Sequence, residues 1–311
     1  MIFDAHTHWL PKKIIENAHF FSPVWGDIKR QLEVMDELKV DKALLVYPTT
    51  DAHKRMELKE VVRIYNNSIA EIINKYPQRF VGAATLPIDD AKGMVKEFED
   101  IKKMGFKAIS LATSFEGIYL DHERFYPLYE KAEISNMPIF VHPQIIAPIG
   151  YERIKDPLLT PVIEFVFDTT MCIGKLIGAG IFNKFENLKF IFAHLGGVMP
   201  FIKERFDSIY KMLRKRNIVK DLFAMPSEWL KQIYVDTSGA TSHSALMCTI
   251  EMVGADHILW GSDYPGNPDI SNSIKAIKRL NISEEEKKNI LGENIERLLR
   301  SARSPAFRSS Y

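Results

Sequence analysis

The sequence predicts an α/β protein folded as a (β/α)8 (TIM) barrel, with loop insertions at the face where the strands end. Short apolar runs alternate with longer amphipathic runs along the 311 residues, which implies parallel strands joined by helical crossovers. Eight such units follow one another, and this number favours a closed barrel. No glycine-rich GxGxxG motif follows the first expected strand, which removes the commonest open-sheet alternative.

The expected elements follow the apolar periodicity in order. The strands are expected at 2–8, 42–48, 80–87, 106–113, 138–144, 189–196, 233–239 and 258–265. The helices are expected at 27–39, about 54–75, 90–104, 124–136, 160–183, about 200–215, 242–253 and 271–280. In the first helix Ile28, Leu32, Met35 and Leu38 recur at the spacing of three and four that forms one helical face.

No linker or low-complexity segment divides the chain, so we expect one domain over 1–300 and an exposed tail over 301–311. Three segments exceed the needs of a minimal barrel: 9–26, 145–160 and 217–232, the last with a short helix around Trp229. The first two follow strand ends. They would either line a substrate pocket, cap the barrel or meet a partner subunit.

Composition limits the classes of function. A net charge of +1 gives no general attraction to nucleic acid or to an anionic membrane. No apolar run approaches the roughly 20 residues of a transmembrane helix, and the N-terminus lacks the features of a signal peptide. Cys172 and Cys248 each stand alone in apolar stretches, which fits buried free thiols in a reducing compartment. We therefore expect a cytoplasmic protein acting on a small molecule.

Polar residues at three strand ends predict a metal site. His6 and His8 lie two apart on the first strand, so both imidazoles face the same side. His142 and Asp263 end two further strands, and the ends of barrel strands converge where active sites are built. Hydrogen bonds alone would have to satisfy each of these buried groups separately, whereas one divalent ion with three nitrogen ligands and one carboxylate satisfies them all.

The remaining polar candidates have alternative roles. His194 ends the sixth strand and is either a further ligand or, as its neighbours Gly196 and Gly197 favour, an acid–base group. By the strand period Asp4 shares the face of His6 and His8, where it would orient a ligand or accept structural hydrogen bonds.

Other histidines are weaker candidates. His19 and His53 lie in loops on the correct face and would contact substrate if those loops turn inward. His122, His243 and His257 fit solvated or capping positions. There is no GxSxG motif and neither cysteine has a catalytic setting, so the sequence indicates no covalent nucleophile.

With these residues assembled, the chain resembles the amidohydrolase superfamily, and within it the family of aminocarboxymuconate-semialdehyde decarboxylase. The resemblance runs over nearly the whole length and rests on IFDAHTHWLP, FAHLGGVMPFIKERF, IYVDTSG, ILWGSDYP and EKKNILGENIERLL. It implies a TIM barrel, usually a homodimer, with one metal ion, most often zinc, although manganese, cobalt or iron also suit such ligands.

The resemblance also implies residue roles. His6, His8, His142 and Asp263 correspond to the metal ligands, with Asp263 also catalytic. His194 corresponds to the histidine beside the metal-activated water. Relatives with two metals carry a lysine at the end of the fourth strand, whereas here Lys107 stands at its start, so one metal fits better.

Arg205 matches an arginine that binds the substrate carboxylate, in some relatives across the subunit interface. It follows Pro200 by five residues, or ~7.5 Å of helix, which favours action in a neighbouring subunit. The alternative is a surface arginine paired with Glu204 or Asp207.

The resemblance favours non-oxidative decarboxylation of a small unsaturated or hydroxyaryl acid. Hydrolysis of a small amide or lactone is the alternative, because the same apparatus supports attack on a carbonyl. A catalytically silent barrel that only binds a metal or ligand is a third reading, although every expected polar position is filled.

Overall fold

The computed structural model describes residues 1–267 and 269–302, and the rest of the expected C-terminal tail lies outside the described residues. Eight parallel strands form one sheet, in the order β1, β2, β3, β4, β7, β8, β9 and β10. Their bounds are Phe3–His8, Lys42–Val46, Phe80–Ala84, Ala108–Ala112, Ile139–His142, Phe190–Phe192, Tyr234–Asp236 and Ile258–Leu259. All eight expected strands are present in order, each shorter than expected.

The sheet closes on itself between its first strand and the segment after its last. Ala5 donates its backbone N–H to the Trp260 carbonyl at 2.9 Å, and His8 donates to the Tyr264 carbonyl at 2.8 Å. Thr7 and Tyr264 form a parallel bridge. These contacts complete the barrel and bring the residues around Asp263 beside β1.

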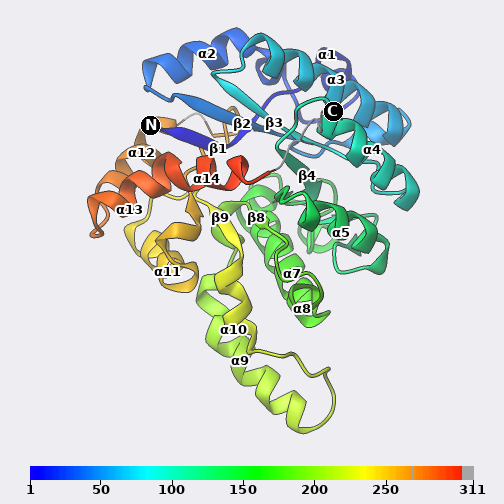
Figure 1. Ribbon diagram of the computed structural model, residues 1–311, viewed down its shortest axis with the longest axis vertical. Helices are drawn as coiled ribbons and strands as arrows, with labels where there is room; N and C mark the ends of the chain where they lie inside the picture. Colours follow the sequence, from blue (N-terminus) through cyan, green and yellow to red (C-terminus); the bar gives the residue numbers. More distant parts are fainter. Residues whose placement is uncertain (268, 303–311) are drawn as a thin grey trace, which may run out of the picture.

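Helices surround the strands, as Figure 1 shows. Their bounds are Lys12–Ile15 (α1), Ile28–Glu37 (α2), Leu58–Lys75 (α3), Ala91–Lys103 (α4), Tyr126–Ile134 (α5), Tyr151–Ile154 (α6), Phe165–Gly178 (α7), Ile181–Lys184 (α8), Met199–Lys215 (α9), Pro226–Trp229 (α10), His243–Val253 (α11), Ile270–Lys278 (α12), Glu284–Lys288 (α13) and Asn294–Arg300 (α14). Several elements were not expected from the sequence: the short helices α1 and α6, the final helices α13 and α14, and a small hairpin of β5 (Ser114–Phe115) and β6 (Ile118–Tyr119).

The single helix expected over 160–183 is wrong. A π-helical turn spans Thr160–Glu164 and leads into α7, and left-handed Gly180 then separates α7 from α8. The π-helical turn shifts the helix register beside the strand ends. Such turns recur at functional sites, and this one contributes to the cavity described below.

Apolar side chains fill the two sides of the sheet. Inside the barrel, Phe3, Leu44, Val46, Phe140 and Ile191 belong to one apolar cluster that also includes side chains of the last helix, α14. Cys172 is buried in α7 as expected, whereas Cys248 is only half-buried in α11, where its thiol contacts the Pro200 carbonyl; both are free. Among the described residues, no helix combines the length and apolar character needed to cross a bilayer.

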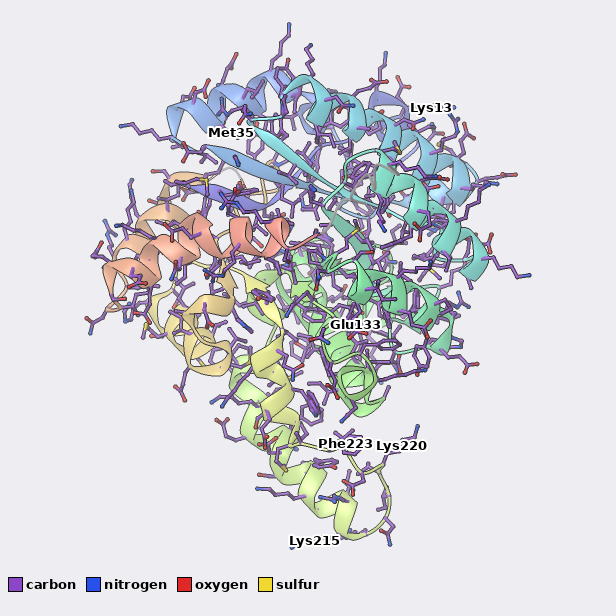
Figure 2. The ribbon with its side chains drawn as sticks, viewed as in Figure 1. Lys13, Met35, Glu133, Lys215, Lys220 and Phe223 are labelled. Carbon is purple, nitrogen blue, oxygen red and sulfur yellow. The ribbon has the colours of Figure 1, made fainter. Side chains whose placement is uncertain are left out.

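Two helices extend away from the barrel as an arm, visible at the bottom of Figure 1. The arm consists of α9, the connection that follows it and α10. Figure 2 places Lys215 at its far end, and Lys220 and Phe223 on the connection that runs back toward the barrel. Phe223 is 93% exposed and Phe201, near the base, is 69% exposed. The arm therefore presents apolar surface that the barrel does not cover.

The close packing of α7 against the turn after β8 gives a stability prediction. A β-carbon at Gly197, where φ is 71°, would collide with the Val166 carbonyl and the Thr170 hydroxyl of α7. We expect Gly197→Ala to lower the free energy of unfolding by about 1–3 kcal/mol. Denaturant unfolding measures this change.

Gly174→Ala is the matched control. Gly174 lies in α7, the helix that Gly197 packs against, but it has open space around it. Alanine there should leave stability unchanged or raise it by about 0.5–1 kcal/mol. Equal stability changes in the two variants would contradict the packing described here.

Candidate metal centre

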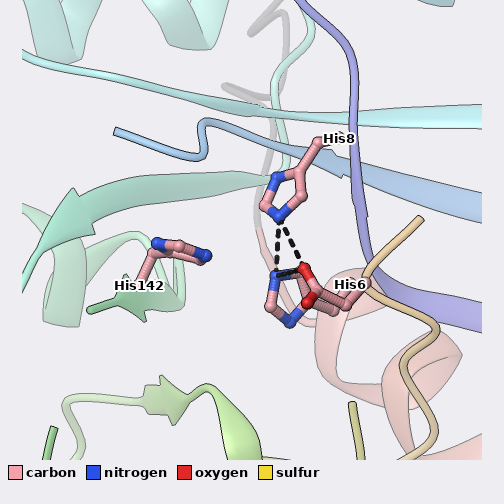
Figure 3. A group of neighbouring side chains, drawn as sticks. His6, His8 and His142 are labelled. Carbon is pink, nitrogen blue, oxygen red and sulfur yellow. Dashed lines mark hydrogen bonds and ion pairs between the residues drawn. The ribbon is translucent and has the colours of Figure 1, made fainter. Parts of the chain in front are cut away.

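Three imidazoles and one carboxylate converge at the ends of β1, β7 and the segment after β10. One ligand atom from each of His6, His8, His142 and Asp263 lies within 4.8 Å of all the others. The Nε2 atoms of His6 and His8 are 3.0 Å apart, and His8 Nε2 lies 3.0 Å from Asp263 Oδ1. Figure 3 shows the rings of His6, His8 and His142 turned toward one another. The predicted grouping of these four residues is present.

The outward nitrogen of each histidine is already hydrogen-bonded. His8 Nδ1 lies 2.9 Å from the Val46 carbonyl oxygen, and His142 Nδ1 lies 2.9 Å from the Pro143 carbonyl oxygen. A carbonyl oxygen only accepts, so both Nδ1 atoms carry the proton. His6 Nδ1 lies 2.9 Å from the Asp236 carboxylate, which also accepts. In the neutral rings the three Nε2 atoms are therefore unprotonated.

Three nitrogen lone pairs and a carboxylate that face one point repel each other unless a positive charge lies between them. The donor set, three imidazole nitrogens and one carboxylate oxygen, suits a divalent transition metal with a position left for substrate or water. Buried polar groups without partners are costly, so the arrangement fits a cation better than it fits an empty core. These residues fit the expected metal ion.

The electrostatics agree with this fit. Burial lowers the pKa of His8, and burial together with the neighbouring histidines holds the pKa of His142 well below its usual value. Burial disfavours charge on Asp263 too, but the close contacts of its carboxylate with the His194, His8 and His6 rings hold its pKa well below the usual value. For His6, burial is outweighed by Asp236, which raises the pKa. The cluster thus attracts one positive charge.

Asp236 is a site residue that the sequence reasoning missed. It ends β9, is fully buried, and accepts from the His6 ring at 2.9 Å and from the His194 backbone N–H at 3.2 Å. The backbone N–H of Ser238 also donates to it, at 2.8 Å. Asp236 therefore fixes the orientation of His6 and the position of His194 at once. The sequence does contain a signal that could have identified it: Asp236 is an acidic residue at the end of a strand, and the expected metal ligands also lie at strand ends.

Asp4 does not share the face of His6 and His8, so that part of the expectation is wrong. A register shift between Asp4 and Thr7 interrupts the pairing of β1 with β2 and breaks the strict alternation. Asp4 instead borders a small cavity with Gln31 and Met35 of α2. It accepts the backbone N–H groups of His6 at 3.1 Å and Ser262 at 2.9 Å, so it is a structural acceptor.

His194 lies beside the four converging residues. It follows β8 in a left-handed conformation with φ 55°, and its Nε2 is 3.6 Å from Asp263 Oδ2. Its side chain is 18% exposed and lines the cavity, while its Nδ1 is buried without a partner among the described residues. This position suits proton exchange with Asp263.

A cavity of about 470 Å³ opens above the cluster, with His8, His142, His194 and Asp263 among the residues that line it. The loop 9–26 contributes Phe20, Phe21 and Trp25, and the segment 145–161 contributes mainly Ile145, Tyr151, Lys155, Pro157 and Pro161. Trp25 stacks on the His8 ring with centroids 5.6 Å apart. Both insertions therefore form walls of the cavity, which was one of the alternatives predicted for them.

His19 and His53 do not line the cavity. His19 is hydrogen-bonded to the Asp51 carboxylate through Nδ1 and lies 2.6 Å from an Arg55 nitrogen through Nε2. His53 Nδ1 contacts the Thr50 carbonyl at 3.0 Å. The His19–Asp51 contact ties the loop that carries Phe20 and Phe21 to the segment after β2.

The remaining histidines lie away from the site. His122 caps the turn before α5 by accepting the Arg124 N–H at 3.2 Å, as expected. His243 begins α11 and is exposed. His257 is half-buried and stacks on Tyr234, so it is a packing residue rather than a solvated one.

Arg205 is exposed on α9 and is not among the cavity residues of its own chain. The alternative partners are engaged elsewhere: Glu204 pairs with Lys203 at 2.8 Å, and Asp207 accepts from Ser227. Arg205 makes no ion pair with any residue in the described part of the chain. Neither of the pairs that the surface alternative named, with Glu204 or with Asp207, is present among the described residues.

Comparison with known proteins identifies the family. The model of the amidohydrolase family matches residues 3–301, and the chain belongs to this family. It is 28% identical to 2-amino-3-carboxymuconate-6-semialdehyde decarboxylase of Dictyostelium discoideum over 94% of this chain and 89% of that one. It is 29% identical to gamma-resorcylate decarboxylase of a Polaromonas strain, over 87% of this chain and 86% of that one.

A solved structure shares the fold. The crystal structure of 5-carboxyvanillate decarboxylase from Novosphingobium aromaticivorans, in complex with manganese and 4-hydroxy-3-methoxy-5-nitrobenzoic acid, superposes with a TM-score of 0.85 at 22% identity. The match covers 96% of each chain. The expected family and barrel fold are both confirmed.

The role of Asp236 yields a prediction that does not depend on turnover. Asp236→Asn removes the charged acceptor that holds the His6 ring, so metal affinity should fall about 10–100-fold. Competition titration with a fluorescent zinc or manganese chelator measures this affinity. Asp256→Asn, an exposed position outside the site, is the matched control and should leave it unchanged. Unaltered affinity in Asp236→Asn would refute the orienting role.

Proposed function

We propose that the protein is a metal-dependent decarboxylase of a small unsaturated or hydroxyaryl carboxylic acid. The observation that carries the proposal is the convergence of His6, His8, His142 and Asp263 at the base of an apolar, aromatic-walled cavity. The relatives and the structural neighbour named above are decarboxylases, and one was solved with an aromatic acid and manganese. The experiment that tests it is measurement of carbon dioxide released from a panel of such acids.

The proposed ligands are His6, His8, His142 and Asp263. A divalent cation held by these residues would supply Lewis-acid chemistry toward the oxygen atoms of the substrate. The Nδ1 contacts of the three histidines keep the rings in the neutral tautomer that binds a metal. Asp236, Val46 and Pro143 thereby preorganise the site.

Asp263 and His194 are the proposed catalytic pair. Decarboxylation breaks the bond between the ring or chain carbon and the carboxyl carbon, leaves the electron pair on the former, and requires a proton there. Asp263 Oδ2 lies 3.6 Å from His194 Nε2, so a proton can pass between the two groups. His194 is partly exposed at the cavity, which gives the pair access to solvent.

The cavity walls would orient a flat substrate and exclude water. Trp25 and Phe21 stand on one side and Phe165 lines the cavity from α7. Aromatic faces at this position favour a planar acid over a compact aliphatic one. Fewer water molecules around the departing carboxylate strengthen the electrostatic contacts that the site provides.

Hydrolysis of a small amide or lactone is the alternative, because the same ligands and the same carboxylate serve hydrolytic sites. Ring opening or ammonia release without carbon dioxide release would favour it. A metal-binding barrel that turns over neither panel would leave the catalytically silent reading.

Zinc is the metal that we propose, on the basis of the three histidine ligands. Manganese is the second candidate, since the structural neighbour contains it. We also propose a cytoplasmic location, which the two free cysteines favour because disulfides are rare there.

We further propose a homodimer in which the arm contacts the partner subunit. Exposed apolar side chains of the arm, among them Phe201 and Phe223, are surface that association would cover. Arg205 lies on the same helix, exposed and without an ion pair among the described residues. It is therefore available to bind the substrate carboxylate in the neighbouring active site.

Two variants test the catalytic pair. Asp263→Asn and His194→Ala should each lower turnover ~100-fold or more, because each removes a group that moves the proton. Circular dichroism and thermal unfolding should show a folded barrel in both. Near-normal turnover in either folded variant would reject the role proposed for that residue.

Arg205→Ala should raise KM for the acid substrate about 10-fold or more, because a charged hydrogen-bonding partner of the carboxylate is lost. Arg279→Ala, an exposed arginine at the end of α12, is the matched control and should leave KM unchanged. Sedimentation of both variants establishes whether the oligomer is intact. A KM equal to that of the unmodified protein would return Arg205 to a surface role.

A further inference from the structure

Among the described residues, the cavity carries one basic side chain outside the cluster of histidines. Lys155 is the one lysine or arginine that lines it in the part of the chain that the structure describes. Its neighbour Asp156 also lines the cavity, but its carboxylate accepts the backbone N–H groups of Leu158 at 2.8 Å and Leu159 at 3.2 Å. Asp156 is thus engaged in the loop, and Lys155 is the group available to an anion.

The backbone holds Lys155 in place at the cavity wall. It follows α6 directly, donates its N–H to the Tyr151 carbonyl at 3.0 Å, and adopts a left-handed conformation with φ 45°. Glycine or asparagine adopts this conformation at lower cost, so the turn alone does not account for a lysine here. Tyr151, one turn earlier, lines the same wall.

The Lys155 ammonium group is only weakly engaged. Its Nζ lies 3.4 Å from Glu152 Oε2, but the Lys155 side chain is 62% exposed and that of Glu152 is 80% exposed. Solvent screens an ion pair in this setting, and two flexible side chains hold it loosely. An anion inside the cavity, with aromatic walls on one side, competes well for the ammonium group.

We propose that Lys155 binds a second carboxylate of the substrate, so that the acid consumed here is a planar dicarboxylate. This inference rests on the proposed function, because it takes the first carboxylate of the substrate to lie at the metal centre. One charged end of the substrate then lies at the metal centre and the other at Lys155. The ring or conjugated chain between them lies against Phe21, Trp25 and Phe165.

Calorimetric titration of metal-loaded protein tests this inference with two acids that differ in one carboxylate. The probes are 2-hydroxybenzoate and 4-hydroxybenzene-1,3-dicarboxylate. The dicarboxylate should bind about 10-fold more tightly to the unmodified protein, and Lys155→Met should remove that advantage without weakening the monocarboxylate. Lys155→Arg should keep most of it, because the charge remains.

Two further variants control for charge. Lys275→Met removes an exposed lysine of α12 and should change neither affinity. Glu152→Gln releases Lys155 from its only ion pair among the described residues, and the dicarboxylate should then bind as tightly or more tightly. If the dicarboxylate binds Glu152→Gln more tightly than the unmodified protein, the effect comes from the freed Lys155 ammonium group. A loss of loop stability would instead weaken binding.

Equal affinity for the two acids, no binding of the dicarboxylate, or an equal loss of both in Lys155→Met would overturn the inference. Carbon dioxide release is measured separately on the same samples. If the dicarboxylate binds in a Lys155-dependent way and no carbon dioxide appears, the proposed reaction fails while the substrate class stands. If carbon dioxide is released from the monocarboxylate alone, at the same rate in Lys155→Met, the reaction stands and the substrate class fails.

Discussion

The structure depends on one electrostatic constraint, which is that three imidazole nitrogens without protons face a carboxylate at a single point. His8 and His142 are held by carbonyl oxygens that can only accept, so their inner nitrogens carry lone pairs. With the Nε2 atoms of His6 and His8 only 3.0 Å apart, the arrangement is costly without a cation. The barrel holds the four groups together against this repulsion. Each ligand lies at the end of a buried strand or in the segment just after one, and the apolar core beneath fixes the strands.

Closure of the sheet makes the constraint possible. Asp263 and His8 are far apart in sequence, and the hydrogen bonds between β1 and the segment after β10 place them in contact. Asp236, from the neighbouring strand β9, reaches the His6 ring by the same closure. Above this rigid base, the two long loops supply aromatic and basic side chains, so the chemistry comes from strands and the choice of substrate from loops.

Much of this was predictable from sequence because the signals are local. The period of two in a strand placed His6 and His8 on one face, and eight alternating units predicted the barrel. Asp4 was misplaced because a bulge in β1 breaks that period, and a bulge depends on pairing with β2 that no local pattern reveals. Asp236 was missed because its role depends on a contact with a strand about 230 residues away. The π-helical turn at Thr160–Glu164 was missed because it lies within a continuous apolar pattern that predicts an ordinary helix.

The most direct test of the account is the metal content of protein purified without chelators, measured by elemental analysis and located by anomalous diffraction. We predict on the order of one divalent ion per chain, bound between the Nε2 atoms of His6, His8 and His142 and the carboxylate of Asp263. A crystal of such protein with no anomalous peak between these four side chains, together with negligible zinc, manganese, cobalt and iron in solution, would contradict it.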